Sequence, residues 1–532
     1  MSSKKIAIIA SVVISIVVIS ILFSNLVTRS TIENEKPVEK PVNDLSTSDL
    51  QNNSIPENIS YSIFKSKYVT TFSLPNGTGP NGILADNNGL VWTSGSSSHS
   101  LFRLDFKDDK LRSYPIPEKK HWQTMVWSMV EDKDGNIWFS QLGANPLWRF
   151  DPHTETFSLF HTGSPPFQMK VENTTGNIWF TTLTGNTIGV IQVENKTEPS
   201  YKITEFPIGH DTDPSGLFLK DGSIWVAELG KGKIVKFDVL RNNGLVNKIT
   251  ETLEIPPGKN QFSSPTDVLV SDNQTVWVTE HTPSTISEYN LKSNDWKRFS
   301  TAQAVHPIPT LPFWMRESLD HKGIWFNEHQ GNRVAFLNTT DHTLAEFDIP
   351  NNQPPELSPY MFNNPIAPQN IVAQNGYYST IFTLNLSLDP TNSNRLWFSQ
   401  WDNDKVGVVD RTSTLSFDIH SDHTKPILLN NNTMQKATIN IEISRNNIMT
   451  NQTDQNLVFL GASSSMMTDG GFAKIIANFT VSSVDLSKIN KPVPVQLILQ
   501  NEGATAGNYT LGISASDGLV TKTIFFDLDI LQ

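Results

Sequence analysis

A tryptophan-centred motif recurs along most of this chain. A turn rich in Asp, Asn or Gly is followed by an aliphatic residue, then Trp, then usually an aromatic residue or Val. The tryptophans of the motif are Trp92, Trp138, Trp179, Trp225, Trp277, Trp325 and Trp397. Most intervals are about forty to fifty residues, a period typical of propellers and solenoids.

Each copy of the motif reads as four short strands. In the fourth copy they are SGLFLKDG with its turn, SIWVAE, KIVKFDV and KITETLEI. Apolar residues alternate with polar ones, and Gly, Asn and Asp mark the turns, which indicates antiparallel strands. Four-stranded units of this length are typical of propeller blades, because radial closure protects the sheet edges. The sequence predicts an all-β chain with a seven-bladed β-propeller over residues 61–422 and tryptophans packed between blades.

Two segments compete for the strand that closes the ring. KYVTTFSLP (67–75) and STLSFDI (413–419) both read as a fourth strand for the last blade. The pattern does not choose between them. A Pro- and Asn-rich insertion at about 350–380 precedes the last blade, and it reads equally well as an ordered lid or as a surface loop.

The Trp motif ends before residue 425, and the C-terminal segments beyond it are still strand-like. They are KATINIEIS, FAKIIANFTVSS, PVPVQLILQN and NYTLGISASDGLVTKTIFFDLDIL. The last contains Asp517-Gly518, a dipeptide well suited to a hairpin turn. We expect a small Ig-like β-sandwich over residues 423–532, with a stalk or spacer role.

The N-terminus has the features of a membrane-targeting segment. Lys4 and Lys5 precede the uncharged run Ile6–Leu26, which is long enough to span a bilayer. Residues 1–29 are therefore predicted to be a transmembrane helix with a cytoplasmic N-terminus, which places the rest outside the cell. A cleaved signal peptide is the alternative, although the run is long for one. Residues 30–60 are polar and poor in large apolar residues, so we expect a disordered tether.

Composition excludes some functions. The net charge of −12 argues against nucleic acid as a partner, because nucleic acid requires clustered Lys and Arg. Cysteine is absent, which removes disulfides and cysteine-ligated zinc. No Walker loop, HExxH or nucleophile elbow occurs. The expected partners are the membrane, a small-molecule or peptide ligand at the propeller mouth, and cell-surface proteins or glycans.

Polar residues recur where the second strand of each predicted blade ends. Three positions after the Trp stand Gly95, Gln141, Thr182, Glu228, Glu280, Glu328 and Gln400. The fifth and sixth blades add His281 and His329 directly after the Glu. The loops that join neighbouring blades at the same rim carry His121, His161, His210 and His306.

These side chains form the candidate site. Glu228, Glu280 and Glu328 are the candidate metal ligands, because carboxylate oxygens suit a hard divalent cation. The candidate catalytic residues are His281, His329 and His210, since imidazole is the natural base near neutral pH. The alternative is that the Glu belongs to the repeat and bonds neighbouring backbone, while the loop histidines are simply solvated.

The blade unit resembles the repeat of the streptogramin (virginiamycin B) lyase family. The similar segments include GPNGILADNNGLVWTS, GNIWFTTLTGNTIGVI and DPSGLFLKDGSIWVAELGKGKIVKF, together with ITEFPIG. The resemblance covers residues ~68–420 and implies a Mg²⁺-dependent lyase that opens a cyclic ester (depsipeptide) by elimination. It implies His281 or His329 as the base and Glu280 and Glu328 as Mg²⁺ ligands. The competing interpretation is a non-catalytic cell-surface propeller that binds a peptide, glycan or protein.

Overall fold

Strands dominate the residues that the computed structural model describes, which are 38–41, 57–117, 126–141, 146–195, 200–240, 245–256, 263–272, 274–281, 283–301, 310–329, 331–350, 383–430, 435–446, 456–466, 475–504 and 506–531. In these ranges there is no α-helix, and 3-10 helices occur at Trp401–Asn403 (η3) and Leu486–Lys488 (η4). The predicted all-β class is confirmed.

Several predicted segments lie outside the described residues. They are the span Ile6–Leu26, nearly all of the tether and residues 351–382 of the insertion. In the described part of the chain, no helix has the length and apolar character needed to cross a membrane. The chain divides into the units Met1–Glu39 and Lys40–Gln532, and the Trp-motif sheets and the C-terminal strands belong to the second unit.

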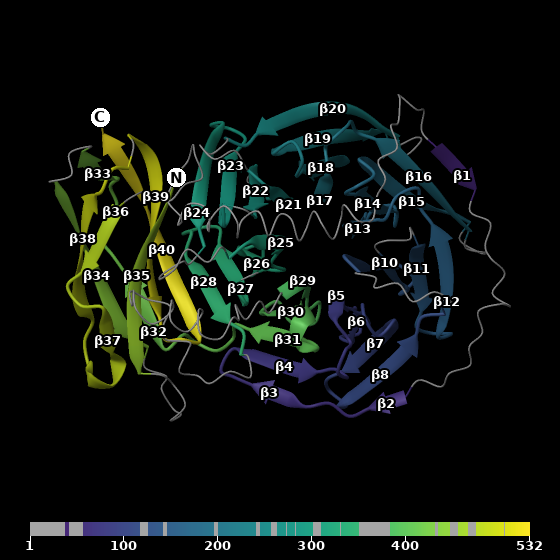
Figure 1. Ribbon diagram of the computed structural model, residues 1–532, viewed down its shortest axis with the longest axis horizontal. Coiled ribbons are helices and arrows are strands. Elements are labelled where there is room, and N and C mark those ends of the chain that lie inside the picture. Colours follow the sequence, from purple (N-terminus) through teal and green to yellow (C-terminus); the bar gives the residue numbers. More distant parts are fainter. Residues whose placement is uncertain are drawn as a thin grey trace, which may run out of the picture. The chain divides into compact units, whose positions relative to one another are not determined.

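Sets of four strands follow one another along the chain, and hydrogen bonds join the strands of each set in one order (Figure 1). The first strands are β5 (Pro80–Ala85), β9 (Met129–Glu131), β13 (Met169–Val171), β17 (Pro214–Lys220), β21 (Pro265–Val270), β25 (Pro312–Glu317) and β29 (Thr383–Leu388). The second strands are β6 (Val91–Gly95), β10 (Ile137–Ser140), β14 (Ile178–Thr182), β18 (Ser223–Glu228), β22 (Thr275–Glu280), β26 (Gly323–Glu328) and β30 (Arg395–Gln400).

The outer half of each set completes the sheet. The third strands are β7 (Ser100–Asp105), β11 (Pro146–Asp151), β15 (Thr187–Asn195), β19 (Lys233–Leu240), β23 (Thr285–Asn290), β27 (Arg333–Asn338) and β31 (Lys405–Asp410). The fourth strands are β8 (Lys110–Pro115), β12 (Thr156–His161), β16 (Ser200–Pro207), β20 (Leu245–Glu254), β24 (Asp295–Ser300), β28 (Leu344–Asp348) and, from the start of the chain, β4 (Val69–Ser73). The remaining short N-terminal strands are β1 (Val38–Pro41), β2 (Glu57–Ile59) and β3 (Ile63–Lys65).

The first strands form a closed cycle. Each contacts the first strand of the next set, from β5 to β9 and onward to β29, and β29 contacts β5 again. The motif tryptophans fill the space between consecutive sheets. Trp92 packs in one core with Phe139 and Phe150 of the following sheet, and Trp397 packs with Val91 and Phe102 across the junction between the last and first sheets. The predicted packing role of the tryptophans is confirmed.

The strand that closes the last sheet comes from the N-terminal segment. β4 pairs antiparallel with β31, from Lys405 opposite Ser73 to Val409 opposite Val69. The competing segment is used elsewhere, because β32 (Phe417–His420) pairs with β34 (Lys436–Arg445). The C-terminal sheets therefore begin before residue 423, the boundary expected from the sequence.

The C-terminal strands form two further groups. One contains β32, β34, β38 and β36, and the other contains β33, β40, β39, β35 and β37. Their bounds are β33 (Ile427–Asn430), β35 (Leu457–Met466), β36 (Ile475–Phe479), β37 (Ser483–Asp485), β38 (Val493–Asn501), β39 (Gly507–Ser516) and β40 (Val520–Leu531). β39 and β40 form the hairpin predicted at Asp517-Gly518, with Ser516 opposite Thr521 and Gly518 at φ 83°.

The second group continues a sheet of the ring. β40 pairs antiparallel with β28, from Leu344 opposite Thr523 to Phe347 opposite Val520, and Figure 1 shows the two strands side by side. The ring contact Phe299–Phe525, with centroids 5.1 Å apart, adds side-chain packing at the same junction. Strand pairing covers the exposed edge that β28 would otherwise present. The C-terminal region is therefore joined to the ring by backbone hydrogen bonds.

Candidate functional site

The polar residues predicted at the strand ends do lie at one edge of their sheets. Glu228, Glu280 and Glu328 are the last residues of β18, β22 and β26. Each stands opposite the first residue of the neighbouring inner strand, with Pro265 opposite Glu280 and Pro312 opposite Glu328. The register read from the sequence therefore places these carboxylates at the same end of their blades.

Glu280 binds an arginine of its own sheet. Arg298 on β24 donates from Nε to Oε1 at 2.8 Å and from Nη2 to Oε2 at 2.9 Å, and the Ser287 hydroxyl donates to Oε1 as well. Both the Glu280 and Arg298 side chains are buried. The carboxylate thus reaches outward from the second strand to the fourth. All the strong donors it needs are supplied by the same blade.

Glu328 lies in a buried group of acids around one arginine. Arg333 Nη1 is 4.0 Å from Glu328 Oε2, and Arg333 Nε donates to Asp348 Oδ1 at 2.8 Å. Burial, followed by the neighbouring Glu346, raises the pKa of Glu328 well above its ordinary value. One cation cannot balance three carboxylates in a poorly solvated place. Burial and the neighbouring acids therefore favour the protonated form of Glu328.

Glu228 has a lysine as its neighbour. Lys233 Nζ is 3.7 Å from Glu228 Oε2, and the two residues face each other across β18 and β19. Burial raises the pKa of Glu228, and Lys233 opposes that rise. The three candidate metal ligands thus sit in three separate sheets, and each has a cation of its own sheet beside it.

This donor chemistry does not fit Mg²⁺. A magnesium site needs ionised oxygen ligands that converge on one point. Glu280 already accepts from Arg298, and burial raises the pKa of Glu328, which disfavours its ionised form. Within the described ranges, no group of three or more His, Asp or Glu side chains is arranged to hold a metal ion. The Mg²⁺ assignment remains a prediction without a matching donor set among these residues.

Two of the predicted histidines do come together. The rings of His281 and His329 have centroids 5.8 Å apart, although 48 positions separate them in the sequence numbering. Both rings also contact Phe313 on β25, at 5.5 Å from His281 and 5.8 Å from His329. The backbone N–H groups of both histidines donate to inner-strand loops, His281 to Ser264 O at 2.9 Å and His329 to Leu311 O at 3.0 Å. These bonds fix the start of each loop.

Burial makes both imidazoles poor proton carriers. It lowers the pKa of His281 to about 4. It also lowers the pKa of His329 to about 3, with a further contribution from the proximity of His281. Both rings are therefore neutral at neutral pH. His281 Nε2 is a buried nitrogen with no hydrogen-bond partner among the described residues, so it can accept a proton from a group placed against it.

The remaining candidate histidines do not join this pair in the described residues. His210 is exposed in the turn between β16 and β17, and His161 is exposed at the end of β12. His121 and His306 lie outside the described residues. Among the candidate histidines that the structure describes, the ring contact joins His281 and His329.

Sequence reasoning missed an aromatic layer beside the histidines. It consists of Trp127, Phe167 and Phe313, which come from three different blades and are all buried. Ring centroids are 4.8 Å apart for Trp127–Phe167, 5.9 Å for Trp127–Phe313 and 6.4 Å for Phe167–Phe313. A signal for this layer exists in the sequence, because each of the three stands just before an inner strand or at its start. The repeat pattern alone suggests only blade packing for such aromatic residues.

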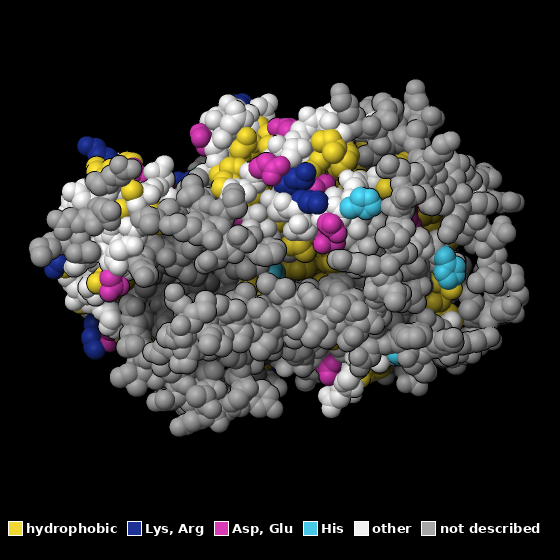
Figure 2. All heavy atoms as spheres, turned by 45° about the horizontal axis from the view of Figure 1, so that its top comes forward, with side chains coloured by type: hydrophobic (Ala, Val, Ile, Leu, Met, Phe, Trp, Pro, Cys, Tyr) yellow, Lys and Arg dark blue, Asp and Glu magenta, His cyan; other side chains and the backbone are white. Residues whose placement is uncertain are grey.

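The face shown in Figure 2 contains a recess with apolar side chains in it and acidic, basic and histidine side chains around it. Aromatic faces favour flat apolar or ring-shaped ligands through stacking. A neutral imidazole pair beside an aromatic layer is therefore suited to bind such a ligand and to exchange a proton with it.

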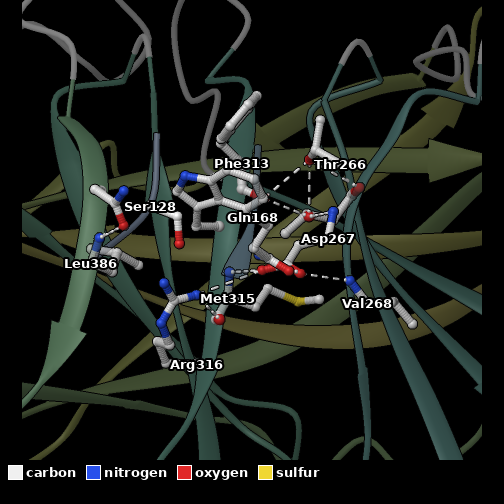
Figure 3. A network of polar contacts seen from close by, with 12 residues as sticks. Ser128, Gln168, Thr266, Asp267, Val268, Phe313, Met315, Arg316 and Leu386 are labelled. Carbon is white, nitrogen blue, oxygen red and sulfur yellow. Dashed lines mark hydrogen bonds and ion pairs between the residues drawn. The ribbon is translucent and has the colours of Figure 1, made fainter. Parts of the chain in front are cut away.

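A polar network lies farther along the inner strands (Figure 3). Gln168 Nε2 donates to Asp267 Oδ1 at 3.0 Å, and Gln168 Oε1 accepts from Leu217 N at 2.6 Å. Asp267 also accepts from Met315 N at 2.8 Å. Gly216 makes this approach possible, because a Cβ there would lie 2.5 Å from Asp267 Cα. The network ties Gln168, the residue before β13, to β17, β21 and β25.

The strand order and the cyclic contacts of the inner strands define a β-propeller with histidines at one rim. Residues 58–250 match the model of the Virginiamycin B lyase family. The resemblance predicted from the blade repeat is confirmed for that part of the chain.

Several solved structures are similar to this chain. Virginiamycin B lyase from Staphylococcus aureus is 20% identical, with 64% of this chain and 98% of that chain covered and a TM-score of 0.48. A streptogramin B lyase is 19% identical, with 64% and 97% covered and a TM-score of 0.49. The extracellular domain of a protein described as a hybrid two-component system from B. thetaiotaomicron is 15% identical, with 90% and 60% covered and a TM-score of 0.43. No curated relative matches the chain.

Proposed function

We propose that the protein is a seven-bladed β-propeller with a C-terminal Ig-like sandwich that opens a cyclic ester by elimination. The histidine pair at the rim supplies the base. The match of residues 58–250 to the Virginiamycin B lyase family supports the reaction class. The observation that carries the proposal is the convergence of His281 and His329 on Phe313, with both rings neutral at neutral pH.

Elimination needs a base and a means of holding negative charge. In this proposal one imidazole takes the proton from the carbon α to a carbonyl group, and the electron pair of that C–H bond forms the new C=C bond. The alkyl C–O bond of the ester breaks, and the carboxylate leaves with its electrons. The second neutral imidazole donates its N–H to the oxygen on which charge develops.

Burial suits a histidine to this role in one respect. A base with a pKa near 4 is deprotonated at every pH above about 5, so it is always ready to accept a proton. The same low pKa weakens it as a base, because basicity follows pKa. Exclusion of water by the bound ligand and the aromatic layer would compensate in part, since it strengthens every electrostatic interaction in the site.

Magnesium has no step in this proposal. When bound, Mg²⁺ would supply Lewis-acid stabilisation of the enolate charge. The Arg298 pairing of Glu280 and the raised pKa of Glu328 argue against these residues as its ligands. Addition of Mg²⁺ is nevertheless one arm of the experiment below.

We also propose the location predicted from the sequence. Residues 6–26 anchor the protein in the cell membrane as a single span, with the N-terminus cytoplasmic and the propeller outside. A small-molecule or peptide ligand would then reach the rim from the extracytoplasmic side. Protease protection of the propeller in right-side-out vesicles would contradict this orientation.

A non-catalytic function is the second candidate. The specific observation in its favour is that all three rim carboxylates have a cation beside them, which leaves none of the three free to take part in chemistry. Such a rim suits binding of a peptide, glycan or partner protein without chemistry. The same experiment separates the two candidates.

The test uses the full-length protein with a cyclic depsipeptide, with and without Mg²⁺, and follows the product by chromatography and mass spectrometry. Elimination opens the ring without changing its mass, whereas hydrolysis adds one water. We expect an isomeric open-chain product that is lost in His281→Ala or His329→Ala. Binding of the depsipeptide without conversion would instead favour the non-catalytic candidate.

Three controls separate chemistry from folding. His153→Ala changes an exposed histidine in the turn between β11 and β12 and should leave the rate unchanged. His210→Ala tests the third candidate histidine, and a retained rate would remove it from the site. Glu280→Gln tests the metal assignment. If Glu280 is a Mg²⁺ ligand, the rate of the variant should no longer depend on Mg²⁺. If Glu280 is structural, the variant protein should be less stable instead.

A further inference from the structure

The inner strands carry an unbalanced group of charges that the rim chemistry does not use. It consists of Lys170 on β13, Asp267 on β21 and Arg316 on β25. Asp267 and Arg316 form an ion pair with Nη1 and Oδ2 3.7 Å apart. Lys170 interacts electrostatically with both of them. The group therefore holds two cationic side chains and one carboxylate.

The carboxylate is already committed. Asp267 accepts hydrogen bonds from Gln168 Nε2 at 3.0 Å, Val268 N at 3.0 Å and Met315 N at 2.8 Å, in addition to its ion pair. Its side chain is 2% exposed. Three donors and a guanidinium satisfy a carboxylate, so Asp267 has little capacity left for Lys170.

The two cations keep donors to spare. Arg316 Nη1 donates to Met315 O at 2.7 Å. A guanidinium carries five N–H donors and an ammonium three, so the bond to Met315 O and the ion pair with Asp267 use only part of this capacity. The Arg316 side chain is 19% exposed, so solvent and small solutes reach it. Spare guanidinium and ammonium donors side by side are the usual means of binding phosphate or carboxylate.

The group is separate from the histidine rim. Phe313 and Arg316 lie on the same strand three residues apart, which is about 10 Å along an extended chain. Figure 3 shows the ring of Phe313 and the guanidinium of Arg316 on opposite sides of the Gln168–Asp267 bond. Arg316 therefore lies across this bond from Phe313, the residue that both histidine rings contact.

We propose that Lys170 and Arg316 form an oxyanion-binding site on the inner strands, distinct from the histidine rim and taking a small phosphate or carboxylate group. The bound anion supplies a second negative charge, so that the two cationic side chains are balanced by the anion together with Asp267. The Arg316 fork and the Lys170 ammonium donate to its oxygens, while the Gln168–Asp267 bond closes the site toward the rim.

Proton linkage gives this site a measurable signature. Burial, and then repulsion by Arg316, lowers the pKa of Lys170 to about 7, while Asp267 opposes the shift. Lys170 is therefore partly deprotonated at pH 7.5 without an anion. A bound oxyanion favours the charged form, so binding takes up a fraction of a proton near this pH.

The test is calorimetric titration of the full-length protein with sodium phosphate and, separately, sodium acetate, at ionic strength matched with sodium chloride. Titrations in two buffers of different ionisation enthalpy at pH 7.5 give the proton uptake. The phosphate and acetate arms decide which oxyanion the site takes. We expect saturable binding of at least one and proton uptake that is absent at pH 5.5.

Two variants and a control make the test specific. Lys170→Met should weaken binding about ten- to a hundredfold, the loss of one charge-assisted hydrogen bond. Asp267→Asn should tighten it, because a competing negative charge is removed. Lys220→Met is the matched control, since Lys220 on β17 is paired with Asp272, and it should change affinity less than about twofold.

Three results would overturn the proposal. The first is that phosphate, acetate and chloride give equally weak binding in the titration. The second is an unchanged affinity in a Lys170→Met protein that folds cooperatively, and the third is binding without proton uptake at pH 7.5. None of these results depends on lyase activity, so the site is tested independently of the rim.

Discussion

Arg298 and Glu280 form a fully buried, two-pronged ion pair between the fourth and second strands of one sheet. Their side chains are 1% and 0% exposed, so each charge depends on the other for its solvation. The pair explains why a position that looks like a metal ligand in the sequence is a structural element in the fold.

Removal of one partner of this pair should be costly. We expect Glu280→Ala to lower the free energy of unfolding by roughly 3–5 kcal/mol, because it leaves the Arg298 guanidinium buried and unpaired. The double variant Glu280→Leu with Arg298→Met should lose less than either single change. Urea unfolding at neutral pH measures this, with exposed Asp295→Ala on the same strand as Arg298 as control. Equal effects of Glu280→Ala and Asp295→Ala would contradict the pairing.

The raised pKa of Glu328 should appear in the pH dependence of stability. Its pKa is raised in the folded protein, so folding favours the protonated form. The stabilisation is complete below the ordinary value of about 4.5 and is lost as pH rises through the folded pKa. We expect Glu328→Gln to raise the melting temperature more at pH 8 than at pH 5.

Thermal unfolding across that pH range tests the Glu328 prediction, with exposed Glu502→Gln as the matched control. A gain from Glu328→Gln that is larger at acid pH would show that the carboxyl is ionised in the fold.

The histidine pair should produce the opposite dependence. The pKa of His281 falls to about 4 and that of His329 to about 3, so protonation favours the unfolded chain. Their stabilisation is complete above about 6.5 and is lost as pH falls toward 4, by on the order of 3 kcal/mol for each histidine. Replacement of both by Gln should flatten the unfolding free energy between pH 6.5 and 4.5.

Urea unfolding at a series of pH values measures the effect of the pair, and His153→Gln should leave the curve unchanged. If the pair is also the catalytic base, the rate should stay constant down to pH 5. A rate that falls with a midpoint near 6.5 would assign the proton transfer to an exposed histidine.

Asp404 should stabilise the closure of the ring, where the N-terminal strand β4 pairs with β31 of the last sheet. Its carboxylate accepts from Gly77 N and Gly79 N, each at 2.7 Å, and its backbone carbonyl accepts from Leu74 N at 2.7 Å. Loss of two charge-assisted hydrogen bonds in Asp404→Ala should cost about 1–3 kcal/mol. Limited proteolysis should then cleave the N-terminal segment around β4 first. Exposed Asp422→Ala is the control, and equal proteolysis of both variants would contradict this role.

The rim shows where sequence reasoning succeeded and where it stopped. The strand register was readable, because the residue three positions after a motif Trp ends the second strand in six of the seven sheets, and in the other, with Trp138, it follows the strand directly. The partners of those residues were not readable. Arg298 is 18 positions from Glu280 and belongs to the fourth strand, and only the packed sheet brings its guanidinium onto the carboxylate.

The histidine pair was predictable for a related reason. His281 and His329 occupy equivalent positions in consecutive blades, so a ring places them next to each other whatever their separation in sequence. His210 precedes an inner strand instead of following a second strand, so it does not occupy the same position in its blade as His281 and His329. Trp127, Phe167 and Phe313 were overlooked because each looks like ordinary core when viewed one blade at a time.

The sequence by itself determined the strand class, the blade period and the tryptophan packing, because these depend on local alternation and on a repeat that every copy carries. The tertiary structure alone decided which strand closes the ring, how the C-terminal sheets attach through β28 and β40, and which charges are paired. Those outcomes depend on contacts between segments far apart in the chain, such as Lys170 with Arg316, and no local pattern records which distant partner a buried charge will meet.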